Sequence, residues 1–264
     1  MMMKEKLLII GEVNIMYFIK KFLFLSVILT FVISISNFCF ATTIQEEKNK
    51  IPEEVRSDFD EINELKKDYI KNYNKLINKA NFIIEKYPND KIVTTLCYHI
   101  IGRTYEENNN LIKARKYYEN AYKLDSTSSR VNYDFGIFEF KSKNYDKSIY
   151  YLTNVINIED NDKIKSSSEK YIGDCYYNQK NYNEAINHYN SGNNFYKRKS
   201  LYYMLGMCFL EMKDYSTAIE NFTQAIIMDP NYGYAYRNRG IAYRKIGSEE
   251  QARQDLQKAK NLGA

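Results

Sequence analysis

The sequence is poor in the residues that most enzymes use for catalysis. Its 264 residues include two histidines, four cysteines and no tryptophan. No HExxH, CxxC or GxSxG motif is present, and no glycine-rich loop could hold a phosphate. The acidic residues are scattered along hydrophilic stretches, as on a solvated surface, rather than arranged as an acid and base pair. We therefore expect no enzymatic activity, no cofactor and no metal site.

A long hydrophobic run lies near the N-terminus. Lys20 and Lys21 precede an uncharged stretch from Phe22 to Ser36, and the small residue Ala41 follows at a suitable cleavage position. This order is typical of a secretory signal peptide, so we expect residues 1–41 to be a leader. An uncleaved membrane anchor is the alternative, because the 19 residues of 22–40 come close to the roughly 20 that a bilayer span needs.

Both interpretations place the rest of the chain across the cytoplasmic membrane, since the lysines hold the N-terminus inside. The chain would then be secreted, periplasmic or at the cell surface, and it would touch the membrane only through this segment. A signal peptide of ordinary length would begin at Met16. We therefore expect translation to start at Met16, and we expect the protein to come from a bacterium. Residues 42–50 are expected to form a flexible linker.

Net charge is low for a protein that binds nucleic acid. The formal net charge is +5, and without the leader there are 34 basic and 31 acidic residues, a net charge of +3. Nucleic-acid-binding proteins usually carry a concentrated basic face. The sequence therefore predicts no nucleic-acid partner.

Cysteine is too sparse for a disulfide framework. Beyond the leader three remain, namely Cys97, Cys175 and Cys208, an odd number without close spacing. Cys175 and Cys208 each stand two residues after a glycine. We expect them to serve as small, buried apolar side chains.

Glycine is scarce as well, but half of the ten glycines are regularly spaced. The intervals are 34, 37, 33 and 34 residues, between Gly102, Gly136, Gly173, Gly206 and Gly240. A small residue follows each of them by twelve positions: Ala114, Ser148, Ala185, Ala218 and Ala252. A period of this size indicates stacked supersecondary units.

The clearest copy has two apolar stripes at helical intervals. The first consists of Tyr202, Leu205, Gly206 and Phe209, and the second of Tyr215, Ala218, Phe222 and Ala225. A polar turn at Lys213-Asp214 separates them, and Pro230 ends the second helix. Each unit is therefore predicted to be a hairpin of two antiparallel helices.

The small residues predict close packing of these helices. Glycine inside a helix costs about 1 kcal/mol relative to alanine, so its repetition needs a compensating gain. We expect the glycine column to face the alanine column, with the two backbones nearly touching. A third small column, in which Val155 is the larger exception, would pack against the next hairpin: Ala121, Gly192, Ala225 and Ala259.

These residues resemble the signature of the tetratricopeptide repeat family. The match consists of Tyr202-x2-Leu205-Gly206-x2-Phe209, Ala218-x3-Phe222 and Pro230. It extends over five copies, at residues 95–128, 129–162, 166–198, 199–232 and 233–264. The resemblance implies an all-α fold, a right-handed superhelical solenoid of antiparallel helix hairpins.

Some parts depart from the family pattern. Ser148 replaces an alanine, and Glu139 interrupts an aromatic column, where its neighbours Phe138 and Phe140 suggest a local shift. Residues 51–94 are expected to form a divergent hairpin or cap, because no glycine marks their first helix. The helix that begins near Ser248 has a narrow apolar stripe and a wide polar face, as expected for the end of a solenoid.

The resemblance also implies a partner-binding surface on the concave face of the first helices. The residues expected there are Arg103, Tyr133, Lys170, Tyr171, Asp174, Tyr203, Met204, Met207, Tyr234, Arg237 and Asn238. Tyrosine, methionine and arginine are enriched at protein interfaces. Some family members hold a peptide's C-terminal carboxylate with a Lys and an Asn one helical turn apart. Here Asp174 follows Lys170 at that position, and its negative charge predicts no such binding.

Two functions remain open. The chain is either an extracytoplasmic scaffold that binds a protein or peptide in the groove, for envelope or surface assembly, or a structural solenoid that assembles with itself as a homo-oligomer without a peptide ligand.

Overall fold

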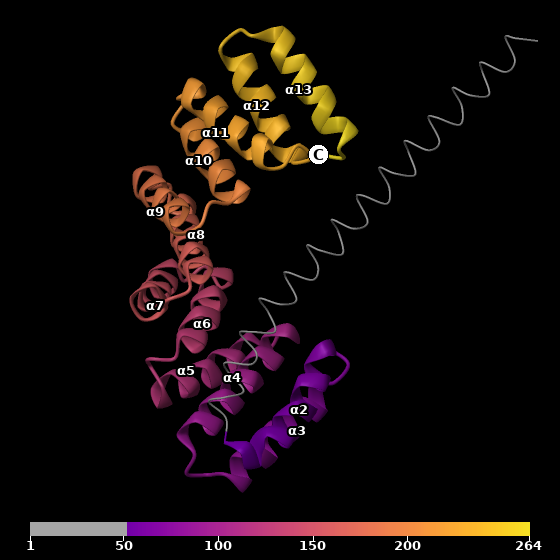
Figure 1. The fold of residues 1–264 in the computed structure, drawn as a ribbon, viewed down its shortest axis with the longest axis vertical. Helices are drawn as coiled ribbons and strands as arrows, with labels where there is room; N and C mark the ends of the chain where they lie inside the picture. Colours follow the sequence, from indigo (N-terminus) through magenta and orange to yellow (C-terminus); the bar gives the residue numbers. More distant parts are fainter. Residues whose placement is uncertain (1–51) are drawn as a thin grey trace, which may run out of the picture. The chain divides into compact units, whose positions relative to one another are not determined.

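A computed structural model describes residues 52–264. This part contains twelve α-helices and one short 3-10 helix, and no strand occurs within it (Figure 1). The expected leader at 1–41 and linker at 42–50 lie outside the described residues. The chain divides into two compact units, with the boundary between Asn63 and Glu64.

The described part of the first unit belongs to helix α2 (Glu53–Leu65). Val55, Phe59 and Ile62 are buried, and their spacing places them on one face of the helix. Neither this helix nor any other between residues 52 and 264 combines the length and apolar character that a bilayer span requires.

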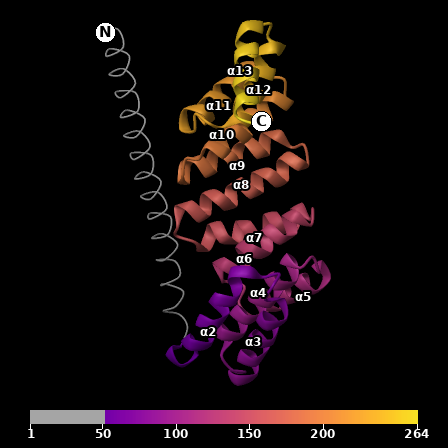
Figure 2. The same cartoon turned by 90° about the vertical axis from the view of Figure 1, so that its right-hand side faces the viewer.

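Residues 64–264 form one leading helix and five hairpins. The elements are a 3-10 helix (Lys66–Asp68), α3 (Tyr73–Lys86), α4 (Lys91–Glu107), α5 (Leu111–Leu124), α6 (Ser129–Lys141), α7 (Tyr145–Ile158), α8 (Asp162–Asn178), α9 (Tyr182–Phe195), α10 (Lys199–Glu211), α11 (Tyr215–Met228), α12 (Gly233–Lys245) and α13 (Glu249–Asn261). The hairpins pair α4 with α5 and so on to α12 with α13, and they follow one another along this unit (Figure 2). The prediction of an all-α solenoid of helix hairpins is confirmed.

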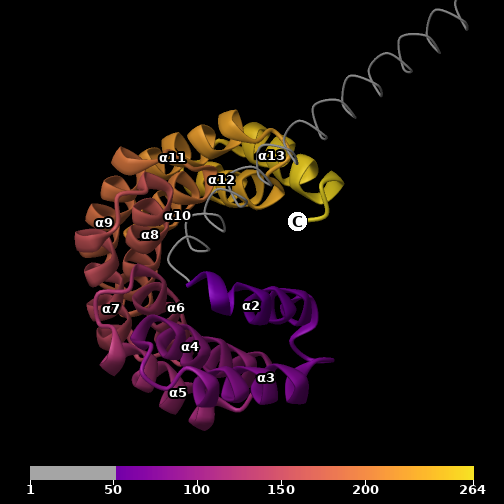
Figure 3. The ribbon, with the colours of Figure 1, turned by 60° about the horizontal axis from the view of Figure 1, so that its bottom comes forward.

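Within this unit the two helices of a hairpin take different sides. The first helices α4, α6, α8 and α10 lie on the inner side of the curve, and the second helices α5, α7, α9 and α11 lie on the outer side (Figure 3). We call the inward surface of the first helices, α12 included, the inner face.

Two first helices begin before the predicted repeat boundaries at 95 and 166. Asp90 Oδ1 accepts a hydrogen bond of 3.0 Å from the Val93 amide, so α4 begins at Lys91. Asn161 Oδ1 accepts one of 2.9 Å from the Lys163 amide, so α8 begins at Asp162. Side chains of this kind satisfy the free amides of a first turn, and they extend these helices beyond the glycine-based pattern.

All five hairpin turns share one backbone geometry. The residue seven positions after each repeat glycine has a positive φ, between 58° and 79°: Asn109, Lys143, Lys180, Lys213 and Gly247. The amide of the next residue donates to the carbonyl five residues earlier, as in Asp214 N to Phe209 O at 2.9 Å. The backbone conformation of the turn is therefore the same in all five hairpins, although its side chains differ.

The shared turn geometry corrects the expectation of a local shift around Glu139. Asn144 N donates to Glu139 O at 2.9 Å, the same bond as in the other hairpins, so the register is unchanged. The Glu139 side chain is fully buried in the aromatic column, where Arg115 Nη2 lies 3.0 Å from its Oε2 and Asn144 Nδ2 donates to the same oxygen at 2.6 Å. Charge pairing replaces the missing ring.

The glycine column also has a different partner from the one expected. A Cβ at Gly206 would lie 2.6 Å from Phe222 Cε1, and one at Gly173 would lie 2.5 Å from Tyr189 Cε1. The nearest neighbours are thus large side chains of the second helix, four residues beyond the alanine column. In these two hairpins glycine makes room for a ring. At Gly136 and Gly240 the nearest side chains are Leu152 and Leu256, and at Gly240 the backbone of the alanine column is close as well, with Ala252 O 3.2 Å from a Cβ there. In the third column, a Cβ at Gly192 would lie 3.2 Å from Leu201 of the next hairpin.

A candidate binding surface on the first helices

The inner face is made from a few equivalent positions of each first helix. Residues three and two before the repeat glycine, and one, four and five after it, fall on one side of the helix because 3.6 residues complete a turn. Ten of the eleven residues expected on the concave face are half-buried or exposed, and Asp174 is buried. Sequence reasoning missed Leu210 and Ile241, which a comparison of these same positions across the repeats would have found.

At α4 and α6 the inner face is occupied by the protein's own contacts. Arg103 Nη1 lies 3.7 Å from Asp134 Oδ2 and Arg103 Nε 4.0 Å from Glu107 Oε1. The Tyr69 ring covers its guanidinium, with the Cζ atom 5.5 Å from the ring centroid. Arg103 was expected to bind a partner, but these groups already engage it.

His99 joins this cluster from the interior. Its Nε2 lies 2.7 Å from Asp134 Oδ2, and burial lowers the pKa of His99 against the opposing effect of the carboxylate. Burial alone would raise the pKa of Asp134, but the hydrogen bond with His99 and the charge of Arg103 hold it below its usual value. A neutral imidazole thus donates to an ionised carboxylate, and this pair links α4 to α6.

The structure corrects the expected role of Asp174. The side chain is buried, with Lys170 Nζ donating to its Oδ2 at 2.5 Å and the Tyr189 hydroxyl donating to its Oδ1 at 2.9 Å. The carboxylate is therefore an internal acceptor and presents no free charge to a ligand. Lys170, one helical turn before Asp174 on α8, is engaged in the same contact.

Aromatic rings line the inner face between α6 and α8. Tyr133 and Tyr171 meet edge to face with centroids 6.4 Å apart, and Phe140 meets Tyr171 in the same way at 5.5 Å. Burial raises the pKa of Tyr133. The phenol rings are half-buried, so they offer apolar area with polar tips.

The next pair of first helices is joined through Tyr203. Asn238 Nδ2 on α12 donates to the Tyr203 hydroxyl on α10 at 2.9 Å, and the Tyr203 ring lies 5.2 Å from that of Tyr232. Burial raises the pKa of Tyr203, although Asn238 and Arg237 act against it. Tyr234 is 56% exposed, and Arg237 is exposed as well.

A serine, a histidine and a glutamate meet elsewhere, between α8 and α9. Ser191 Oγ donates to Glu169 Oε1, and His188 Nδ1 lies against Glu169 Oε2, both at 2.6 Å. Both α9 side chains thus point at the carboxylate, which leaves the serine without a base. This arrangement ties two helices together and does not form a nucleophile.

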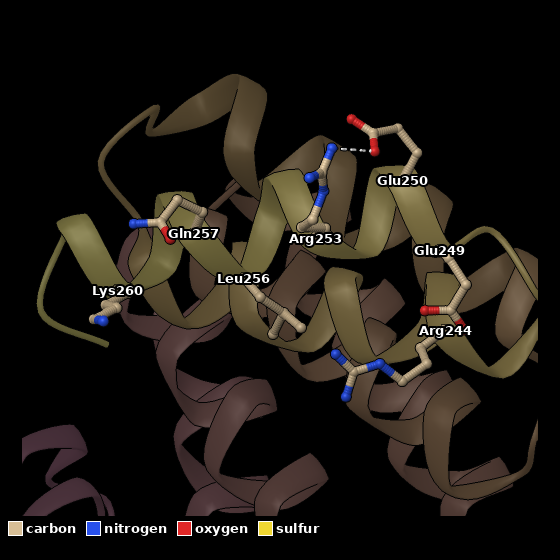
Figure 4. Close-up of a pocket in the computed structure, with 7 residues that line it drawn as sticks. All are labelled: Arg244, Glu249, Glu250, Arg253, Leu256, Gln257 and Lys260. Atoms are coloured by element: carbon tan, nitrogen blue, oxygen red, sulfur yellow. Dashed lines mark hydrogen bonds and ion pairs between the residues drawn. The ribbon is translucent and has the colours of Figure 1, made fainter.

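The last hairpin carries an open depression. It is lined by Arg244, Glu249, Glu250, Arg253, Leu256, Gln257 and Lys260 (Figure 4). The lining charges have both signs, and Arg253 Nη2 is paired with Glu250 Oε2 at 2.6 Å. This lining agrees with the wide polar face that the sequence predicts for the helix beginning near Ser248.

Ligands for a metal do not converge anywhere between residues 52 and 264. Cys97, Cys175 and Cys208 are buried, and burial raises the pKa of Cys208 to about 12. These thiols pack as small side chains.

Comparisons with known proteins point to the same architecture. Models described as tetratricopeptide repeat match residues 96–128 and 200–232. A crystal structure of MamA protein superposes with a TM-score of 0.58 and 20% identity, over 64% of this chain and 91% of that one. YrrB, described as a tetratricopeptide-repeat protein with an unusual peptide-binding site, gives a TM-score of 0.55 and 18% identity over 69% of this chain and 91% of YrrB.

No curated protein matches the sequence. At identities near 20% the structural likeness is one of fold. Together with the two matched repeats and the five hairpins, it identifies the architecture. Residues 96–128 and 200–232 match tetratricopeptide repeats, and the described part of the chain has the all-α solenoid fold of proteins built from such repeats.

Proposed function

We propose that the chain is a scaffold that binds a protein partner through its inner face, outside the cytoplasm. One observation carries the proposal. Half-buried tyrosine and methionine side chains recur at two positions of the first helices: Tyr133 and Tyr203 stand three residues before the repeat glycine, and Tyr171 and Met204 two before it, with Met207 on the same side of α10. Such side chains contribute large contact areas at interfaces.

The tetratricopeptide-repeat architecture supports this role, since YrrB is described as having a peptide-binding site. The apolar leader that follows Lys20 and Lys21 supports export. Lys170 and Asp174 are paired with each other. Neither is therefore free to hold the terminal carboxylate of a peptide ligand.

Crosslinking in the native cell tests the proposal. Ser200 stands six residues before Gly206, on the same side of α10 as Met207. The full chain, with a photoreactive residue in place of Ser200, should capture a defined partner in the exported fraction. The double variant Tyr203→Ala/Met207→Ala should lose most of that capture. The control Ile112→Ala alters a residue of α5 that is 87% exposed, and it should capture as the parent does.

Two results would count against the proposal. Equal capture by the parent and the inner-face variant would remove the groove as the binding surface. Capture of a second copy of this chain alone, with a matching oligomer in light scattering, would favour the self-assembling solenoid.

A further inference from the structure

Apolar side chains are concentrated on the inner face of α10. Met204, Met207 and Leu210 stand two before, one after and four after the repeat glycine, and all three are half-buried. Two of the equivalent positions on α4 hold Arg103 and Glu106. The inner face therefore changes from polar at the first hairpin to apolar at the fourth. Ile241 continues this ridge onto α12 at the same position as Met207.

Cations without ion pairs border the ridge on α12. Arg237, Arg244 and Lys245 are exposed, at positions four before, three after and four after Ile241, so they share its side of the helix. Within residues 52–264 none of the three lies in an ion pair. The inner-face cations Lys141 and Lys170 are instead paired, with Glu106 at 2.7 Å and with Asp174 at 2.5 Å.

The inner positions of α10 and α12 accordingly have an excess of positive charge, while Glu249 and Glu250 of α13 line the depression beside Arg244 (Figure 4). Glu211, at the end of α10, is the one acidic residue among the inner positions of α10 and α12 defined above. Acidic side chains of a partner would find complementary charge along α12 and apolar contact along α10.

The chemistry of the ridge favours a helix over an extended segment. Met204, Met207 and Leu210 offer no hydrogen-bond donor or acceptor of ordinary strength to a peptide backbone. An extended segment buried on them would leave backbone amides and carbonyls unsatisfied, which is costly. A helix satisfies these groups internally, and flexible methionines adapt to its apolar side chains.

We propose that the inner face of α10 and α12 binds an amphipathic helix of a partner protein, with acidic side chains flanking its apolar stripe. The stripe lies over Met204, Met207 and Leu210, and the acidic flank faces Arg237 and Arg244. This inference rests on the proposed binding role of the inner face and specifies the chemistry of the occupant.

Three synthetic peptides test the charge requirement. Each has 18 residues and the same leucine positions at helical spacing, with flanks of Glu, Gln or Lys, which have similar helix propensities. Fluorescence anisotropy with the full chain should show the Glu peptide binding about tenfold more tightly than the Lys peptide at low salt, from several exposed charge pairs. The difference should shrink in 0.5 M salt, and circular dichroism should show helix formation on binding.

Variants locate the effect. Arg237→Glu/Arg244→Glu should reverse the order of the Glu and Lys peptides. Met207→Ala/Leu210→Ala should weaken all three peptides, with circular dichroism confirming an intact fold. Lys116→Glu changes an exposed lysine of the outer helix α5 and should alter none of the affinities.

Equal binding of the Glu and Lys peptides would overturn the inference, as would an order that survives the double charge reversal. If the Gln peptide binds through Met207 while charge has no effect, the binding role of the inner face stands and this inference fails. If the native partner is captured through the inner face but no peptide binds, the inference again fails alone. If neither is bound, both proposals fail.

Discussion

Single glycines set how closely a second-helix ring can approach the first helix. At Gly206 and Gly173 a methyl group would lie within 2.7 Å of two ring atoms of Phe222 or Tyr189, closer than carbon atoms pack. Both rings are fully buried, so they cannot swing into solvent to make room. The close packing of the two helices in these hairpins therefore requires glycine, which has no Cβ, at positions 173 and 206.

We predict that Gly206→Ala destabilises the protein by about 1–3 kcal/mol, because overpacking outweighs the gain of about 1 kcal/mol in helix propensity. The free energy of urea unfolding measures the effect. Gly102→Ala is the matched control, since its Cβ would lie 3.2 Å from the nearest Tyr118 atom, and it should cost less. A Gly206→Ala variant as stable as the parent would show that Phe222 repacks freely.

The turn between the two helices is the feature that matters at the scale of the element. Lys143, Lys180 and Lys213 adopt positive φ angles of 60° to 65°, a region that side chains with a Cβ occupy at a cost. The fifth hairpin has Gly247 at this position, where a φ of 79° is unstrained.

Lys213→Gly should therefore stabilise the fourth hairpin by about 0.5–1 kcal/mol, since relief of the left-handed strain exceeds the added entropy of glycine in the unfolded chain. Thermal unfolding would show a higher Tm. Gly247→Ala provides the opposite test and should lower Tm. A drop in Tm for Lys213→Gly would mean that the lysine stem makes a stabilising contact that outweighs the strain.

The hairpins were predictable from the sequence, because the glycine period and the two apolar stripes depend on local spacing. The pairings were not. Asp174 looks like a free acid in the sequence, and its role depends on Tyr189, which stands fifteen residues later on another helix. The match of Glu139 with Arg115 has the same origin, since a helix face does not reveal which side chain of its neighbour will meet it.

Over the whole of residues 64–264, stability depends on contacts between successive hairpins, as in other repeat solenoids. The first and second hairpins are joined in part by the His99–Asp134 pair, with Arg103 and Tyr69 around it. Arg130 also faces this pair. The junction should therefore respond to pH.

Stability should fall as the pH is lowered from 7 to 5. The pKa of His99 is lower in the folded protein than in the unfolded chain. As the pH falls through about 6.5, the ordinary pKa of histidine, the unfolded chain therefore takes up a proton first, and this favours unfolding. The lowered pKa of Asp134 acts in the same direction below about pH 4. Urea midpoints measured across this range provide the test.

His99→Gln keeps a donor for Asp134 but cannot titrate, so its midpoint should change less between pH 7 and 5 than that of the parent. Parallel pH profiles for the two proteins would show that another group governs the dependence.

The shared backbone geometry of the five turns fixes how the two helices of each hairpin are aligned, whichever residues lie on the inner face. The bond from the turn amide to the carbonyl five residues earlier is present even where a buried glutamate replaces an aromatic ring. A hairpin can therefore exchange its inner-face residues without moving its neighbours. The same turn geometry thus occurs in the hairpins of α4 and α6, whose polar side chains pair with one another, and in the hairpin of α10, which carries the methionine ridge. The residues of the inner face can therefore differ from one hairpin to the next.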